Sequence, residues 1–348
     1  MTDEPIFVVG SPRSGTTMLR DALRSHSRLT FPPESGVLAH LYRRHRDPTT
    51  DRAARRLAAD LLGSAWIAAW KLDLTPADLE QHRSFGGVVC ELYGAWARRE
   101  GKARWGDKTP LYVTELPTIL RIFPSAKIVH IIRDGRDVAC SLRRQPWGPT
   151  NVYTAALLWR RAVETGRAAG KLLGPSVYRE LRYEALVATP EPELRALCGF
   201  LGERFEPSLL CLDRILPPPG WTPPWPPHQA EAIDSSTAGI WRTVMSSDDR
   251  AVFEAVAGDV LAALGYPVGK RVRHPGRVER LLCHGRDGLG FVHWRLTDSQ
   301  RVPMARQSAR LRRNPPTRVW DMKSGAVVPD QILRKPRPLA NGAESPST

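Results

Sequence analysis

Short apolar segments of strand length alternate with longer segments of helical spacing between residues 5 and 268. Residues 127–132 (KIVHII) are apolar at almost every position, which predicts a parallel strand that is covered on both faces. Further extended segments are predicted at 6–9, at 29–31, at the start of 103–112 and at 176–181. Since helical spacing lies between these segments, we predict an α/β fold with a doubly wound parallel sheet flanked by helices.

Helical spacing is clearest where apolar residues recur every three or four positions. One helix is expected to begin after residue 15, and another is expected to end at residue 123. Further helices are expected at 133–144, 153–173 and 247–264. Residues 36–100 form a helical insert in this interpretation, because Leu57, Leu61 and Ala65 follow that spacing. Prolines at 48 and 76 divide the insert, so three or four helices are predicted there.

Two segments depart from this alternation. Residues 215–229 carry seven prolines between Pro217 and Pro227, which excludes a helix or a central strand and predicts a stiff surface loop. Residues 270–348 have weak periodicity with scattered Arg and Pro, and are interpreted as a poorly ordered extension. The chain is therefore divided into a main domain at 1–269 and an extension at 270–348.

The extension carries most of the net charge of +15. It holds 17 Lys and Arg against 6 Asp and Glu, or +11, which leaves +4 for residues 1–269. A basic extension can contact nucleic acid, an acidic partner or a membrane surface, but a solvated appendage is the favoured interpretation. Since its arginines are not interleaved with aromatic residues in an RNA- or DNA-binding motif, no specific nucleic acid is expected.

Composition narrows the class of protein further. A hydrophobic content of 42% is sufficient for a full core, and the apolar stretches are too short to span a bilayer. The five cysteines lie far apart, and the nine histidines do not cluster at metal-ligand spacing, so neither a disulfide framework nor a metal site is predicted. A strand begins almost at the first residue, and we expect a cytoplasmic protein whose oligomeric state is left open.

The candidate chemistry begins at GSPRSGTT (10–17), which joins a predicted strand to a predicted helix. Its glycines have the spacing of a phosphate-binding P-loop, but Thr16 stands where a nucleotide triphosphatase carries its lysine. Backbone N–H groups and the start of the helix still form an anion site, so ATP hydrolysis is not expected but anion binding is. The loop offers Arg13, Ser14, Gly15, Thr16 and Thr17 for this purpose.

This loop resembles the 5′-phosphosulfate-binding loop of sulfotransferases that use 3′-phosphoadenosine 5′-phosphosulfate (PAPS), a family whose fold is related to that of P-loop kinases. The stretch KIVHIIRDGRDVACSL (127–142) resembles the strand and helix with which that family binds the ribose 3′-phosphate. The resemblance assigns that role to Arg133 and Ser141. It covers roughly residues 5–268.

Two further stretches, PPES (32–35) and WGDKTP (105–110), resemble the tyrosylprotein and bacterial branch of the family. The resemblance implies that Glu34 acts as base and that Lys108 contacts the transferring group. It implies metal-independent, in-line transfer of a sulfuryl group from PAPS to a hydroxyl acceptor, which can be a small metabolite, glycan, lipid or phenol. Arg13, Lys108 and the loop N–H groups would stabilise the charge that develops on the leaving oxygen.

One motif of the family is incomplete. In place of the R-K-G-x-x-G-x-W segment that covers the nucleotide, DSSTAGIWR (234–242) keeps Trp241 followed by Arg242. Ser236, Trp241 and Arg242 are the candidates here, with Ser235, Thr237 and Gly239 as further possible donors to the 3′-phosphate. Trp221 and Trp225 either cover the acceptor or pack the Pro-rich loop onto the body.

Other residues are given structural roles, and two other functions stay open. Asp134 and Arg136 are expected to cap a helix and pair on the surface, His130 to lie in the core, and Arg182, Tyr183 and Glu184 to be structural. The alternative functions are a P-loop kinase of a small metabolite and a nucleic-acid-binding protein that uses the basic extension.

Overall fold

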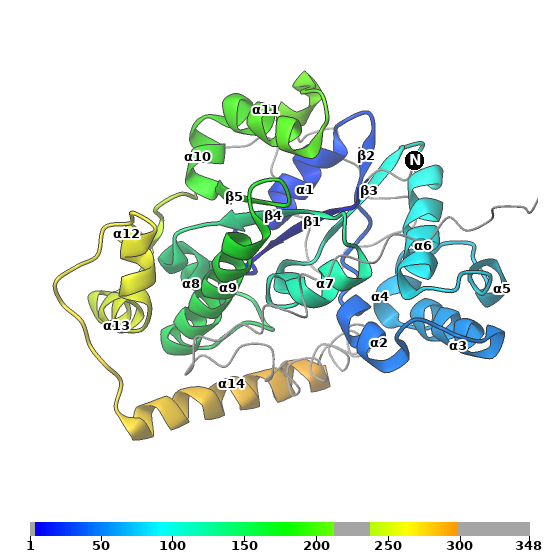
Figure 1. The fold of residues 1–348 in the computed structure, drawn as a ribbon. Coiled ribbons are helices and arrows are strands. Elements are labelled where there is room, and N and C mark those ends of the chain that lie inside the picture. Colours follow the sequence, from blue (N-terminus) through cyan, green and yellow to red (C-terminus); the bar gives the residue numbers. More distant parts are fainter. Residues whose placement is uncertain (1–3, 212–236, 298–348) are drawn as a thin grey trace, which may run out of the picture.

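Five parallel strands form one sheet at the centre of the molecule, with the strand order β2-β3-β1-β4-β5 (Figure 1). In this computed structural model, the described residues are 4–211 and 237–297, with side chains up to 290. The strands are β1 (Ile6–Gly10), β2 (Leu29–Thr30), β3 (Arg104–Lys108), β4 (Lys127–Ile132) and β5 (Tyr178–Arg182). Because all of them run in the same direction, their carboxyl ends lie at one edge of the sheet, where ligands bind in folds of this kind.

Helices connect the strands and cover the sheet. They are α1 (Thr16–Arg24), α2 (Leu38–His45), α3 (Asp51–Leu62), α4 (Ala65–Ala68), α5 (Pro76–Leu79), α6 (Phe85–Arg99), α7 (Leu116–Ile122), α8 (Gly135–Arg143), α9 (Val152–Leu173), α10 (Tyr183–Ala188), α11 (Pro190–Leu201), α12 (Trp241–Val244), α13 (Ser247–Ala263) and α14 (Arg277–Thr297). Two 3-10 helices, η1 (Pro110–Thr114) and η2 (Pro207–Leu210), complete the described elements.

The alternation of side chains along β1 divides the core into two layers. Ile6 and Val8 pack with residues of α1, α10 and α11 on one face of the sheet. Phe7 and Val9 pack on the other face with the helices of the insert and with α7 and α9. Side chains of a strand alternate between the two faces of the sheet, which gives this period of two. In Figure 1 the two layers of helices lie above and below the sheet. The doubly wound α/β fold predicted from the sequence is confirmed.

The structure differs from the sequence prediction in two elements. The insert at 36–100 contains five helices, α2 to α6, rather than three or four, because the single-turn helices α4 and α5 are too short to show helical periodicity. Residues 277–297, assigned to a poorly ordered extension, form the helix α14. Its three glycines at 285, 288 and 290 weaken the helical pattern in the sequence.

Several predictions fall outside the described residues. The Pro-rich loop at 215–229 with Trp221 and Trp225, the two serines Ser235 and Ser236, and residues 298–348 belong to this group. Among the helices that are described, none combines the length and the apolar character needed to cross a membrane.

Candidate active site

The loop after β1 depends on two glycines. A Cβ at Gly10 would lie 2.5 Å from the carbonyl oxygen of Ile131, because β1 and β4 approach each other closely there. Gly15 has a φ of +91°, and a Cβ there would lie 2.5 Å from the ring of Tyr183. Another residue at either position would displace the loop, so the glycines that suggested a P-loop are required by this backbone.

The loop leaves polar groups available for a ligand. Gly15 is the N-cap of α1 and provides no capping side chain, and the first turn, which begins with Thr16 and Thr17, contains no acidic residue. The hydroxyl of Ser14 is buried and has no hydrogen-bond partner among the described residues. Free N–H groups at the start of a helix together with a buried hydroxyl are suited to an anion such as the phosphosulfate end of PAPS.

Arg13 connects the loop to α8. It has a positive φ of 73°, and its Nε donates a hydrogen bond of 3.0 Å to Ser141 Oγ. Burial lowers the pKa of Arg13, nearby Arg133 lowers it further, and Glu34 acts in the opposite direction. These influences show that Arg13 lies near both Arg133 and Glu34, so the structure brings four of the predicted site residues together.

Arg133 follows β4 at the carboxyl edge of the sheet. Its Nη1 lies 3.5 Å from the carbonyl oxygen of Arg13, and its Nη2 donates to the carbonyl oxygen of Thr237. The guanidinium lies 4.4 Å from the ring centre of Tyr183. Its Nε is buried and has no partner among the described residues. A buried donor without a partner is costly, and a bound anion would satisfy it.

Glu34 and Lys108 form an ion pair at the same edge. Lys108 ends β3, and its Nζ lies 2.5 Å from Glu34 Oε1. The Lys108 side chain is almost entirely buried, whereas Glu34 is about a quarter exposed. Burial lowers the pKa of Lys108, and the Glu34 carboxylate counteracts this effect. The pair therefore presents a carboxylate to solvent with a buried ammonium behind it.

A buried network fixes the backbone next to Glu34. Asp107 Oδ2 accepts hydrogen bonds from Ser35 Oγ at 2.7 Å and from Tyr93 at 2.5 Å. The Ser35 hydroxyl also lies 2.8 Å from the Tyr112 hydroxyl, which accepts from the Leu38 N–H at 2.9 Å. Burial raises the pKa of Asp107. This network was not predicted from the sequence, although an acidic residue inside a short strand was a signal for it.

The segment from Thr237 to Trp241 lies beside Arg133. Asp137 accepts from the N–H groups of Gly239 at 2.7 Å and Trp241 at 2.9 Å, and burial raises its pKa. Trp241 is buried, whereas Arg242 is exposed with its guanidinium 5.0 Å from the Trp241 ring centre. The candidate segment is thus placed against the Arg133 site, and Asp137 is a positioning residue that the sequence analysis missed.

One structural expectation needs correction. Arg136 does not pair on the surface, because it is fully buried and contacts Asp134 at 2.7 Å and Glu254 at 2.8 Å. The capping role of Asp134 is confirmed, since its Oδ1 accepts from the Arg136 N–H at 2.9 Å. Tyr183 has a structural role at the site itself, because its ring packs against Gly15 and under the Arg133 guanidinium, and its hydroxyl lies 2.6 Å from Thr237 Oγ1.

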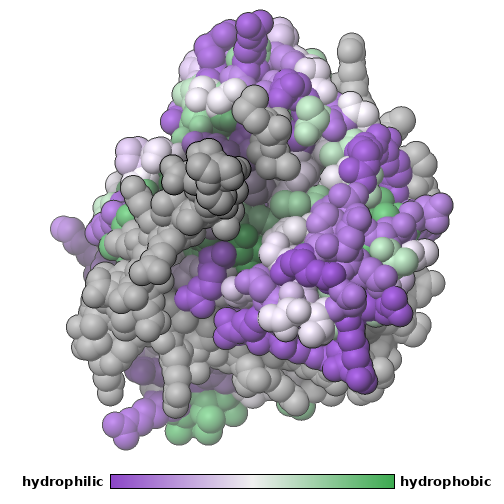
Figure 2. Space-filling model, turned by 45° about the vertical axis from the view of Figure 1, so that its right-hand side comes forward, coloured by the Kyte–Doolittle hydropathy of each residue, from purple (hydrophilic) through white to green (hydrophobic). Residues whose placement is uncertain are grey.

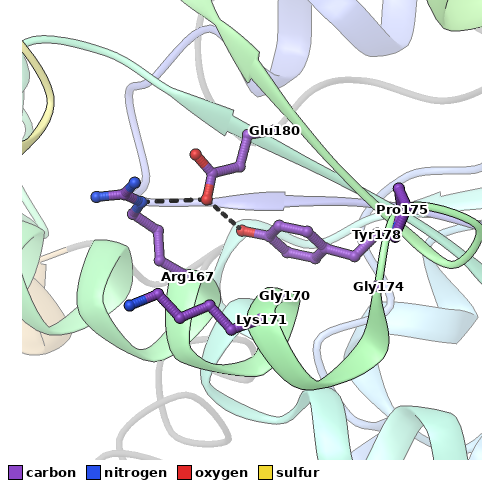
Figure 3. Close-up of a pocket in the computed structure, with 7 residues that line it drawn as sticks. All are labelled: Arg167, Gly170, Lys171, Gly174, Pro175, Tyr178 and Glu180. Atoms are coloured by element: carbon purple, nitrogen blue, oxygen red, sulfur yellow. Dashed lines mark hydrogen bonds and ion pairs between the residues drawn. The ribbon is translucent and has the colours of Figure 1, made fainter.

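Figure 2 shows a mostly hydrophilic surface on the right of the view, next to a recess in which apolar side chains gather. A hollow of roughly 400 Å³ lies between the carboxyl end of α9 and the amino end of β5. Figure 3 shows it lined by Arg167, Lys171, Tyr178 and Glu180 together with Gly170, Gly174 and Pro175. None of the predicted site residues lines it. Among the described residues no cluster of His, Cys, Asp and Glu could hold a metal ion.

Comparison with known proteins identifies the family of this chain. The profile of the Sulfotransferase family matches residues 5–207, and the chain belongs to this family. Sulfuryl transfer is accordingly its class of reaction.

Among its relatives, nodulation protein NoeE of Sinorhizobium fredii is 27% identical over 316 residues, covering 79% of this chain and 69% of the relative. A putative protein-tyrosine sulfotransferase of Caenorhabditis briggsae is 24% identical, covering 60% of this chain and 69% of the relative. The omega-hydroxy-beta-dihydromenaquinone-9 sulfotransferase Stf3 of Mycobacterium tuberculosis is 25% identical, covering 76% of each chain.

A solved structure supports the fold. The sulfotransferase domain of the Synechococcus PCC 7002 olefin synthase has a TM-score of 0.55 and 24% identity, and the match covers 77% of this chain and 96% of that domain.

Proposed function

We propose that the protein transfers a sulfuryl group from PAPS to a hydroxyl-bearing acceptor, with Glu34 as the base. One observation carries this proposal: Arg13, Arg133, Ser141 and the Glu34–Lys108 pair meet at the carboxyl edge of the sheet. Beside them are buried donors on Ser14 and Arg133 that have no partner among the residues that the structure describes. A group of donors with a carboxylate next to it suits a nucleotide with two anionic ends and an acceptor hydroxyl.

The residues divide into two anion sites. The loop from Arg13 to Thr17 would hold the 5′-phosphosulfate, since the uncapped start of α1 provides N–H groups there. Arg133 and Ser141 would hold the 3′-phosphate, and the segment carrying Ser236, Trp241 and Arg242 would cover it. When bound, PAPS supplies a sulfuryl group that is already activated by its link to phosphate, so the transfer needs no metal.

Glu34 and Lys108 would act on the reacting oxygen atoms. Glu34 is exposed enough to accept the proton of an acceptor hydroxyl, and its position is fixed by the buried hydrogen bond of the adjacent Ser35 to Asp107. Lys108 and Arg13 would stabilise negative charge on the leaving side. Because a carboxylate is a weak base, an acidic acceptor such as a phenol would react most readily.

The acceptor is proposed at the level of its reacting group. The named relatives differ in this respect, since one is named for protein tyrosine and another for a hydroxylated menaquinone. The shared element is a hydroxyl, and the class therefore includes small metabolites, glycans, lipids and phenols.

Calorimetric binding of adenosine 3′,5′-bisphosphate without metal tests the nucleotide site. We expect this ligand to bind more tightly than adenosine 5′-phosphate and ATP–Mg²⁺, because Arg133 and Ser141 recognise the 3′-phosphate. Arg133→Ala should weaken its binding by about 10- to 100-fold, which corresponds to the loss of one charge-assisted interaction.

Arg195→Ala is the matched control, because it removes an exposed arginine from α11, outside the site. It should bind like the unaltered protein. A preference for ATP–Mg²⁺, or equal binding with and without the 3′-phosphate, would overturn the proposal and favour a kinase.

A further inference from the structure

Helix α14 carries an apolar face that is open to solvent. Val278, Leu281, Leu282 and Leu289 are between 58 and 73% exposed. Their spacing places them on one side of the helix. Among the described residues, every large apolar side chain that is more than half exposed lies between 272 and 289. Apolar exposure is therefore concentrated on this part of the surface, as is typical of a docking site.

The opposite face of α14 holds the helix on the body. Asp287 accepts hydrogen bonds from the N–H and the hydroxyl of Thr150, both at 2.7 Å. Asn151 donates to the carbonyl oxygen of Cys283 at 3.1 Å, and the ring of His284 contacts Tyr153. These contacts fix the rotation of the helix, so the leucines point away from the body. Figure 1 shows α14 along the lower edge of the molecule, and in Figure 2 apolar side chains stand beside hydrophilic ones at that edge.

The charge around this face is positive. Residues 270–290 contain six Lys and Arg against two acidic residues. Both acidic residues are engaged, since Glu279 pairs with Arg273 at 2.8 Å and Asp287 faces the body. By helical spacing Arg277 and Arg286 lie on either side of the leucines, and both are exposed. An apolar strip bordered by arginines is the pattern of a helix that lies in a membrane interface.

We infer that α14 docks the protein onto an anionic lipid surface. Acyl chains would cover the leucines, while the flanking arginines would contact anionic headgroups. A second copy of this chain is a poorer occupant, because pairing two such faces would bring like charges together. A nucleic acid would match the charge but would leave the leucines uncovered.

Sedimentation of the full-length protein with lipid vesicles tests this inference. We expect binding to vesicles of phosphatidylcholine mixed with phosphatidylglycerol and little binding to phosphatidylcholine alone. Leu281→Ser and Leu289→Ser should each lower the partition coefficient by about tenfold, which is the expected effect of losing one leucine from the interface. Added salt should weaken binding as well, because the headgroup contacts are electrostatic.

Leu172→Ser provides the matched control, since Leu172 is an exposed leucine on α9 that lies outside this face. It should leave vesicle binding unchanged, and circular dichroism of each variant confirms that the fold is retained. Equal binding to neutral vesicles, or leucine variants that bind normally, would overturn the inference. A dimer that Leu281→Ser dissociates would also overturn it, as would duplex DNA binding that the leucine variants leave unchanged.

Discussion

Glu34 and Lys108 act as a unit in this structure, because the carboxylate supports a charge that burial disfavours. Burial lowers the pKa of Lys108, and Glu34 raises it. The exposure of the two side chains differs, so a ligand reaches the carboxylate more easily than the ammonium. This asymmetry suits a base that faces the acceptor and a cation that faces the group being transferred.

Glu34→Gln should lower kcat by about 10²- to 10⁴-fold, because it removes the base while keeping the size of the side chain. The rate of adenosine 3′,5′-bisphosphate release from PAPS, measured with phenol and alcohol acceptors, checks this expectation. Calorimetric binding of the bisphosphate should stay within about threefold of the unaltered protein, since Glu34 is not proposed to hold the nucleotide.

Glu115→Gln is a suitable control, because Glu115 pairs with Arg43 at 2.8 Å and has no role in the proposed mechanism. Full activity of Glu34→Gln, or a loss of nucleotide binding that accounts for the lower rate, would contradict the role of Glu34 as base.

The resemblance to the family's two phosphate-binding motifs was sufficient to find the residues that lie close together in the loop and on α8. Arg133 and Ser141 are eight residues apart, about two helical turns, and the structure places both near Arg13. Tyr183 and Asp137 could not be assigned in this way. Their position at the site depends on contacts with Gly15 and with the segment at 239–241, which are distant in the sequence.

At the scale of elements, one arginine joins the helices beside the nucleotide site. Arg136 at the start of α8 binds Glu254 of α13 and the carbonyl oxygen of Pro267, both at 2.8 Å. Its guanidinium also stacks 3.7 Å from the ring centre of Trp241 in α12. Arg136 therefore fixes the positions of α8, α12 and α13 relative to the end of β4, which Arg133 follows.

Arg136→Met should lower the free energy of unfolding by about 3–5 kcal/mol, because it leaves the buried charges of Asp134 and Glu254 without this partner. Urea unfolding followed by circular dichroism measures the change. Arg160→Met is the control: its pair with Asp259 is partly exposed and its loss should cost about 1 kcal/mol or less. Equal effects of the two substitutions would show that the Arg136 network does not hold these helices together.

Long, strongly periodic elements could be predicted from the sequence, whereas short ones could not. β4 and α9 have their apolar pattern throughout, and they lie where it placed them. The single turns α4 and α5 provide too few positions for a period, and α14 exposes its apolar residues instead of burying them. In the sequence of α14, the glycines and arginines conceal the helical spacing of the leucines, so no helix was predicted there.

At the scale of the whole molecule, His130 lies where the central sheet meets α9. Its Nδ1 lies 2.5 Å from the Tyr178 hydroxyl, and a Cβ on Gly166 would collide with the imidazole, so helix and strand are packed closely. The expected core position is confirmed, although Nε2 has no partner among the described residues. Burial, helped by the nearby charge of Arg167, lowers the pKa of His130 to about 3.

This shift predicts a loss of stability in mild acid. Between pH 6.5 and about 3 the unfolded chain binds a proton at His130 that the folded chain does not bind, so the free energy of unfolding falls as the pH falls. Proton binding at His130 in the unfolded chain lowers the free energy of unfolding by about 2 kcal/mol between pH 7 and pH 5. His130→Gln, which keeps a hydrogen-bonding group for Tyr178, should lack this contribution.

Urea unfolding of both proteins at pH 7, 6 and 5 measures the difference, in which the titration of the carboxylates largely cancels. Exposed His274 serves as the control, because His274→Gln should follow the unaltered protein at each pH. Parallel curves for His130→Gln and the unaltered protein would mean that the imidazole gains its proton without unfolding. The packing between β4 and α9 would then have to open in the native state, and the layer that supports the strand end with Arg133 would be less rigid than its burial indicates.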